Sequence, residues 1–210
     1  MGLKRVLLPF ALTSAIALSP TTGIAAEKNT SASTSTSPAR TRINIDNFAQ
    51  VNANYFRGAQ PDGRDYTDLA ALGVKMVIDL QRDFDPAEQK LVEATGMKFQ
   101  RIGMSTRVAP TKEQLASFLK LVNDPANQPV YVHCAGGRHR TGVMTAAYRM
   151  THDKWTAEQA FKEMKHFKFG ADFLHPEFKQ FVYAYHVEPE SIAPAVLATG
   201  VIASEPDAAR

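Results

Sequence analysis

The segment from Val130 to Gly142 contains residue types that could bind and transfer a phosphate group. A β-branched apolar run ends at His133, a glycine-containing loop follows, and a helix-forming stretch begins at Thr141. In a strand–loop–helix of this kind, successive backbone N–H groups point into the loop, and the helix adds the positive end of its dipole there. The pattern therefore predicts a site for a tetrahedral dianion such as phosphate.

Two side chains in this segment could act on a bound phosphate. Cys134 stands at the first position of the loop, where the field that attracts phosphate should lower the pKa of the thiol below the roughly 8.5 of a free cysteine. Arg140 closes the loop six positions later, and its planar guanidinium can bind two phosphate oxygens at once. The spacing predicts a nucleophile at Cys134 and a phosphate clamp at Arg140.

Cys134 is the only cysteine of the chain, so no intramolecular disulfide can form. A free cysteine is commonly a buried, inert apolar residue. The neighbouring residues argue against that interpretation here and favour a reactive thiol.

The elements that would position this loop follow from periodicity. Short β-branched runs indicate buried strands at residues 75–80, 97–102 and 130–133. Amphipathic stretches with start and stop signals, among them the capping pairs Thr111/Gln114 and Thr156/Gln159, predict helices at residues 66–72, 86–94, 111–122, 141–150, 156–167 and 176–185. This alternation indicates an α/β fold with a central, mostly parallel sheet flanked by helices and a helical C-terminal half.

The chain divides by composition into four segments. Residues 1–26 have a cationic start, an apolar run and small residues at the end, which is typical of a secretory signal peptide. Residues 27–42 are rich in Ser, Thr, Ala and Pro and are expected to form a disordered linker. Residues 43–187 have the size of one domain, and residues 188–210 form a tail without a clear period. We expect an exported protein, periplasmic or secreted.

The charge of the chain gives no support to a nucleic-acid or membrane-surface role. The formal net charge is +3, and Lys4 and Arg5 of the predicted leader contribute to it, so the remainder is close to neutral. The apolar run of the leader is short and interrupted by Pro9, which disfavours stable membrane insertion after signal cleavage. The expected partner is a phosphorylated substrate.

The loop belongs to a longer string that resembles a known family. Residues 133–142 give His-Cys-x-x-Gly-x-x-Arg-Thr-Gly, which is similar to the phosphate loop of the protein tyrosine and dual-specificity phosphatase superfamily. Residues 55–61, 72–74 and 77–80 look like the opening of compact atypical dual-specificity phosphatases of bacteria, fungi and plants. The resemblance covers about residues 51–181.

The resemblance implies a cysteine-dependent phosphatase. Cys134 would form a phosphocysteine intermediate, and Arg140 would bind the phosphate and steady the transition state. His133 would order the loop, and the Thr141 hydroxyl would help the intermediate to be released. No metal and no organic cofactor is expected. The phosphate would be bound by the loop residues Ala135, Gly136, Gly137, Arg138, His139 and Arg140.

The general acid of the family is missing from its usual place. The family carries an aspartate on a loop about thirty residues before the cysteine, where it protonates the leaving oxygen. Here that loop, residues 103–110, contains no carboxylate. Three other carboxylates are candidates for the acid, although carboxylates in such places are more often helix caps or solvated charges than catalytic groups. They are Asp83, Asp85 and Asp172.

The substrate class is open between two expectations. Arg138 and His139 in the loop, and Arg107 at its expected rim, suit a multiply phosphorylated ligand. The fungal and plant enzymes that the sequence resembles include phosphatases of inositol pyrophosphates, so one expectation is a phosphatase of inositol polyphosphates. The other expectation is a phosphotyrosine or dual-specificity protein phosphatase.

Two functions of other classes are weighed against the phosphatase. A catalytically inactive phosphate-binding module is conceivable without the loop acid, but a pure binder does not need a thiolate. A thiol sulfurtransferase or arsenate reductase also uses a cysteine in an anion-binding loop. A reductase usually needs a second, resolving cysteine, and the chain has none.

Overall fold

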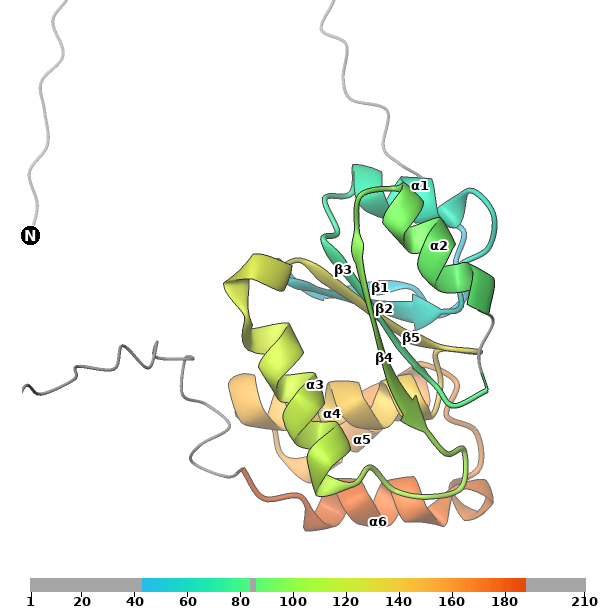
Figure 1. Ribbon diagram of the computed structural model, residues 1–210. Coiled ribbons are helices and arrows are strands. Elements are labelled where there is room, and N and C mark those ends of the chain that lie inside the picture. Colours follow the sequence, from blue (N-terminus) through green and yellow to red (C-terminus); the bar gives the residue numbers. More distant parts are fainter. Residues whose placement is uncertain (1–42, 84–85, 188–210) are drawn as a thin grey trace, which may run out of the picture. The chain divides into compact units, whose positions relative to one another are not determined.

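The structure is a computed structural model that describes residues 43–83 and 86–187. The predicted signal peptide, the linker, the tail and Asp85 lie outside the described residues. The described residues form a five-stranded sheet with helices on both of its faces (Figure 1). This confirms the predicted α/β class and the mostly parallel sheet.

The sheet has the strand order β1-β2-β5-β3-β4. The four strands β2, β5, β3 and β4 run parallel to one another, and the edge strand β1 is antiparallel to β2. The central strand, β5, is buried at every position, as expected for a parallel strand that is covered on both faces. The strands are β1 (Ala49–Asn52), β2 (Tyr55–Ala59), β3 (Met76–Gln81), β4 (Lys98–Met104) and β5 (Val130–Cys134).

Two groups of helices cover the two faces of the sheet (Figure 1). Residues of α1 and α2 pack against one face, and residues of α3 to α6 belong to the core on the other. α4, α5 and α6 follow one another and make up the predicted helical C-terminal half. The helices are α1 (Asp65–Ala71), α2 (Pro86–Ala94), α3 (Lys112–Asn123), α4 (Arg140–His152), α5 (Ala157–His166) and α6 (Pro176–Ala184).

Both predicted capping boxes are present. The Thr111 side chain accepts a hydrogen bond from the backbone N–H of Gln114 at the start of α3, and Thr156 does the same with Gln159 at the start of α5. In each pair the glutamine side chain accepts from the backbone N–H of the threonine in return. These local bonds satisfy N–H groups that a helix start leaves without a partner, which is why the sequence alone locates both helix starts.

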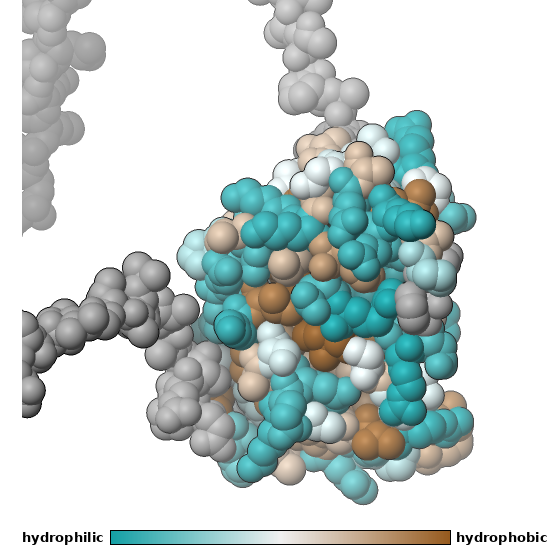
Figure 2. Space-filling model, viewed as in Figure 1, coloured by the Kyte–Doolittle hydropathy of each residue, from teal (hydrophilic) through white to brown (hydrophobic). Residues whose placement is uncertain are grey.

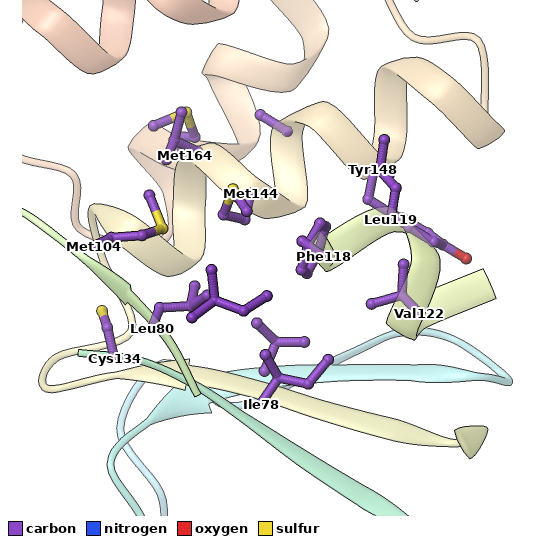
Figure 3. Packing of buried hydrophobic residues seen from close by; sticks show 14 of the residues in the cluster. Ile78, Leu80, Met104, Phe118, Leu119, Val122, Cys134, Met144, Tyr148 and Met164 are labelled. Atoms are coloured by element: carbon purple, nitrogen blue, oxygen red, sulfur yellow. The ribbon is translucent and has the colours of Figure 1, made fainter. Parts of the chain in front are cut away.

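The alternation of side chains along the central strands sorts the core into two clusters. Val130, Val132 and Cys134 of β5 belong to the cluster that holds α3 to α6, whereas Tyr131 belongs to the cluster with α1 and α2. Figure 3 shows Cys134 at the edge of the larger cluster, close to Leu80 and Met104. The thiol therefore sits where the apolar core meets the loop after β5.

Two strands and two short 3₁₀ helices are not predicted by periodicity. β1 is polar and only partly buried, and β2 carries the buried polar residue Arg57 beside Gly58, so neither strand has the apolar run that marks β3 and β5. The 3₁₀ helices span Pro125–Asn127 and Asp172–Leu174. They are single turns, too short to leave a period in the sequence.

The surface is mostly hydrophilic on the face shown in Figure 2, where apolar residues form separate patches. The large apolar side chains that are exposed among the described residues are Leu91, Val108, Phe173, Leu174 and Tyr183. Scattered exposure of this kind is ordinary for a protein surface. No helix in the described part of the chain has the length and apolar character of a membrane span.

Candidate active site

The predicted phosphate loop connects the end of β5 to the start of α4. Cys134 is the last residue of β5 and is 3% exposed, and Arg140 is the first residue of α4 and is 9% exposed. The strands β2, β3 and β5 are parallel, so their carboxyl ends meet at the same edge of the sheet as this loop. In sheets of this type that edge is where ligands bind.

Three successive carbonyl groups of the loop are held by donors from residues 47–60. Because the C=O and the N–H of one peptide unit point in opposite directions, the amides of residues 136–138 face away from these donors, toward the inside of the loop. The backbone N–H of Arg138 accordingly points at the Cys134 sulfur. The three contacts are Gln60 N to Ala135 O at 3.2 Å, Asn47 Nδ2 to Gly136 O at 2.6 Å, and Arg57 Nη2 to Gly137 O.

Gly137 is required for the loop to lie against β2. Its φ is +63°, a conformation that residues with a Cβ rarely adopt. A Cβ at this position would lie 2.4 Å from the carbonyl carbon of Gly58 and 2.7 Å from the N of Ala59. The close approach fixes the loop on the neighbouring strand.

The thiol of Cys134 has a lowered pKa. Burial acts in the opposite direction and raises it, but several favourable interactions outweigh burial: the hydroxyl and the backbone N–H of Thr141, the charge of Arg140 and the N–H of Arg138. The Thr141 hydroxyl is buried and has no other hydrogen-bond partner in the described structure. The site therefore favours a thiolate in a place with little access to water.

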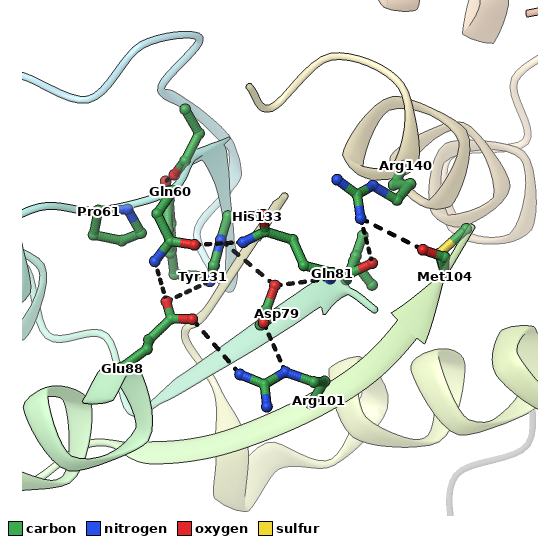
Figure 4. Close-up of polar contacts among 12 residues, drawn as sticks. Gln60, Pro61, Asp79, Gln81, Glu88, Arg101, Met104, Tyr131, His133 and Arg140 are labelled. Carbon is green, nitrogen blue, oxygen red and sulfur yellow. Dashed lines mark hydrogen bonds and ion pairs between the residues drawn. The ribbon is translucent and has the colours of Figure 1, made fainter. Parts of the chain in front are cut away.

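Arg140 reaches back across the carboxyl ends of β3 and β4. Its Nη1 lies 3.5 Å from the carbonyl oxygen of Leu80 and 3.4 Å from that of Met104, at the long end of hydrogen bonding (Figure 4). These two long contacts involve only Nη1, so they orient the guanidinium and leave its other N–H donors unengaged by Leu80 and Met104. The remaining N–H groups can bind an anion in the loop.

His133 points to the opposite face of the sheet, into a buried polar network (Figure 4). Its Nε2 is 3.0 Å from Oε1 of Glu88, and its Nδ1 is 4.0 Å from Oδ1 of Asp79, although neither ring nitrogen has the geometry of a hydrogen bond. Arg101 Nε bonds to Oδ2 of Asp79 at 2.8 Å. The imidazole is thus held from the side of the sheet opposite to the sulfur.

Three side chains of this network, Asp79, Glu88 and His133, are of the types that bind metal ions, and their ligand atoms lie within 4.8 Å of one another. The Oε1 atom of Glu88, however, already accepts hydrogen bonds from Gln60 at 2.6 Å and from the hydroxyl of Tyr66 at 3.4 Å. Arg101 in addition places a cation against the carboxylate of Asp79. The donor set fits a network of ion pairs rather than a metal centre.

The structure treats the three candidate acids differently. Asp83 is exposed and follows the end of β3 by two residues, at the same edge of the sheet as the loop, whereas Asp85 lies outside the described residues. Asp172 is bound to Lys165 at 2.7 Å and to Lys179 at 2.8 Å. The hydrogen bonds from these two lysines lower its pKa, which makes Asp172 a poorer proton donor than expected.

His139 contributes less positive charge to the loop than the sequence suggests. Its ring points away from the phosphate site, with Nε2 3.0 Å from the carbonyl oxygen of Phe169 and its centroid 3.9 Å from that of His175. Burial and then the neighbouring His175 lower the pKa of His139. Arg138, in contrast, is exposed at the mouth of the loop and keeps its side chain close to Gly136.

Several residues of the site cannot be found by motif alone. Asn47 and Arg57 hold the loop from outside the Cys-to-Arg segment, and Glu88 and Arg101 complete the network around His133. The one signal in the sequence is a charged residue within an otherwise apolar run, as at Arg57. Asn47 gives no signal, because an asparagine in a turn is ordinary.

Comparison with known proteins agrees with this geometry. A rice protein named inositol diphosphatase DSP2 is 32% identical over 126 residues, 58% of this chain and 61% of the rice protein. A Dictyostelium discoideum protein named probable tyrosine-protein phosphatase DG1060 is 32% identical over 127 residues, 58% of this chain and 75% of that protein. The chain thus spans less than two thirds of the rice relative.

A solved structure shares the fold. The core catalytic domain of the Saccharomyces cerevisiae PP-IP phosphatase Siw14, in complex with citrate, superimposes with a TM-score of 0.61 at 30% identity, over 68% of this chain and 87% of that one. A family model described as DSP-PTPase phosphatase fused to NAD+ kinase matches residues 32–178, well over half of the chain. The chain belongs to this family of dual-specificity-type phosphatases.

Proposed function

We propose that the protein is a phosphatase that hydrolyses phosphomonoesters, and phosphoanhydrides such as those of inositol pyrophosphates, through a phosphocysteine intermediate on Cys134, with the phosphate bound by Arg140 and the loop amides. The observation that carries this proposal is the lowered pKa of a buried thiol inside a loop whose amides converge on it. An inert core cysteine would have its pKa raised by burial and nothing to offset it.

The reaction follows from these positions in two steps. The Cys134 thiolate attacks phosphorus, so a P–S bond forms while the P–O bond to the leaving group breaks. The leaving oxygen takes up a proton, and Arg140 offsets the charge on the phosphate oxygens. A water molecule then attacks phosphorus, the P–S bond breaks, and Cys134 leaves as a thiolate beside the Thr141 hydroxyl together with inorganic phosphate.

The substrates that suit this site best have a good leaving group. No carboxylate is present on the loop at residues 103–110, and Asp172 is committed to two lysines, so among the described candidates only Asp83 is left to help in protonating the leaving oxygen. Aryl phosphates and phosphoanhydrides need less of that help than alkyl phosphates do. Inositol pyrophosphates and phosphotyrosine are therefore the favoured substrates, consistent with the names of the relatives.

The test is an assay of the wild-type protein beside Cys134→Ser, without metal and with reductant. The substrates are para-nitrophenyl phosphate, a phosphotyrosine peptide, a phosphoserine peptide and inositol pyrophosphates. We expect turnover of the aryl phosphates or the pyrophosphates, slow turnover of phosphoserine, and loss of all activity in Cys134→Ser. A folded wild-type protein that binds inorganic phosphate and turns over none of these substrates would favour the phosphate-binding module instead.

A further inference from the structure

Arg57 of β2 is a buried cation that the mechanism above does not use. The residue is 1% exposed, and its Nε has no hydrogen-bond partner in the described structure. The ion pairs found among the described residues do not include Arg57. A guanidinium buried without a carboxylate is costly for a fold, so a compensating partner is expected.

The contacts of Arg57 lead to the phosphate loop. Its Nη2 donates to the carbonyl oxygen of Gly137, and its guanidinium carbon lies 3.9 Å from the centroid of the Phe167 ring, a cation–π contact. The bond to Gly137 turns the other end of the same peptide unit, the N–H of Arg138, toward the Cys134 sulfur. Arg57 thus acts on the site through the loop backbone.

The charges near Arg57 single out the thiol as the anion that can balance it. Burial raises the pKa of both neighbouring tyrosines, which are therefore neutral at neutral pH. Glu163 is paired with Arg149 at 2.8 Å. Burial lowers the pKa of Arg57, and Cys134 is the remaining group whose negative charge opposes this and favours the charged guanidinium. The titratable groups that act on Arg57 are Tyr55, Glu163, Cys134 and Tyr131.

We propose that Arg57 is a positioning residue of the phosphatase site. It fixes the Gly137 peptide so that the Arg138 amide faces the phosphate, and its buried charge balances the Cys134 thiolate from behind the loop. The inference rests on the proposed function, since it concerns the same thiol and the same bound phosphate.

The first experiment measures the titration of the thiol, which needs no turnover. Because Cys134 is the only cysteine of the chain, the ultraviolet absorbance against pH, minus that of the same protein carrying Cys134→Ser, reports on its thiolate and not on the six tyrosines. Arg57→Met removes the charge and keeps a long apolar side chain. We expect this variant to raise the midpoint of the thiolate titration by about one pH unit, and Arg57→Lys, which keeps the charge, to raise it much less.

The second experiment measures phosphate binding through the same thiol. Inorganic phosphate should protect Cys134 from alkylation by iodoacetamide. Lysine cannot copy the planar guanidinium that meets both Gly137 and the Phe167 ring. We therefore expect both variants to need roughly tenfold more phosphate for half protection than the wild-type protein, a loss of about 1.4 kcal/mol in binding.

The double variant Arg149→Met/Glu163→Gln is the matched control, because it removes both members of an ion pair and leaves no unpaired carboxylate to act on Arg57. Arg149 is also a partly buried arginine in contact with an aromatic ring, but it lies nine residues beyond Arg140 on α4. We expect the double variant to change the stability of the fold and to leave both the titration and the phosphate protection unchanged.

The outcomes separate this inference from the proposed function. An Arg57→Met variant that is folded by circular dichroism and titrates like the wild-type protein would overturn the charge role, and unchanged phosphate protection would overturn the positioning role. If Arg57→Met does not fold, Arg57→Lys tests the positioning role instead, and phosphate protection like that of the wild-type protein would overturn it. A wild-type protein without turnover contradicts the proposed function, whatever the thiol titration gives.

Discussion

At the scale of single residues, the reactivity of the site depends on the balance that sets the pKa of Cys134. Burial favours the neutral thiol, while the Thr141 hydroxyl and backbone N–H, the Arg140 charge and the Arg138 N–H favour the thiolate, and the favourable interactions prevail. Because the pKa is lowered, the nucleophilic thiolate is present at pH values at which a free cysteine is still a neutral thiol. Activity should therefore rise with pH through a midpoint below about 8.5 and fall away on the acid side.

Removing the Thr141 hydroxyl tests this balance. Thr141→Val keeps the size and shape of the side chain and deletes the donor to the sulfur. A hydrogen bond to a charged group contributes about 1.5–3 kcal/mol, so the acid limb of the pH profile of kcat/KM should move to higher pH by about one unit or more.

Two companion variants sharpen the result for Thr141. Thr141→Ser keeps the hydroxyl and should restore the acid limb. Thr151→Val deletes a hydroxyl further along α4, which contacts the Tyr185 hydroxyl at 2.7 Å, and should leave the profile in place. An unshifted profile in Thr141→Val would mean that the hydroxyl does not stabilise the thiolate.

At the scale of elements, the site is a loop whose shape is imposed by β2. Gly137 packs against Gly58 with a positive φ, and the carbonyls of Ala135, Gly136 and Gly137 are all bound from residues 47–60. The amides that would bind phosphate are thus oriented before any ligand arrives. Preorganised donors of this kind lose little on binding.

Gly137→Ala should disrupt this arrangement. The added Cβ would overlap the Gly58 carbonyl carbon, which is backbone and cannot move aside, and the left-handed φ adds strain. We expect the free energy of unfolding measured with urea to fall by about 2 kcal/mol or more, and phosphate binding to be lost.

Gly73→Ala provides the comparison for Gly137→Ala. Gly73 has a φ of +86° and no atom within 4 Å of an added Cβ, so only the conformational cost of about 1 kcal/mol applies. Equal effects of the two substitutions on stability, with phosphate binding retained in both, would show that the contact between the loop and β2 does not shape the site.

At the scale of the whole molecule, the sequence predicts what is local and misses what depends on tertiary contacts. The β3 and β5 strands, the capped helices α3 and α5 and the Cys134–Arg140 loop are encoded in short runs of residues, and each is found in the structure. β2 is missed because Arg57 interrupts its apolar pattern. The reason for that arginine, the Gly137 carbonyl, lies 80 positions away.

The network around His133 is a second example of long-range organisation. Glu88 on α2 meets the imidazole, and Arg101 on β4 meets Glu88 and Asp79, only after the sheet has formed, and no spacing in the sequence links them. The ability of Asp172 to donate a proton also depends on tertiary contacts, because two lysines from different helices form ion pairs with it. Motif reasoning can name candidate carboxylates, but the charges that surround each one decide what it can do.

The most direct test of the account is to look for the phosphoryl group on Cys134. The wild-type protein is mixed with para-nitrophenyl phosphate, quenched rapidly in acid, digested and analysed by mass spectrometry, beside Cys134→Ser. We expect a peptide that carries one phosphoryl group on Cys134 in the wild-type protein, and neither that modification nor turnover in the variant. Turnover that persists in Cys134→Ser without a phosphorylated residue 134 would contradict it.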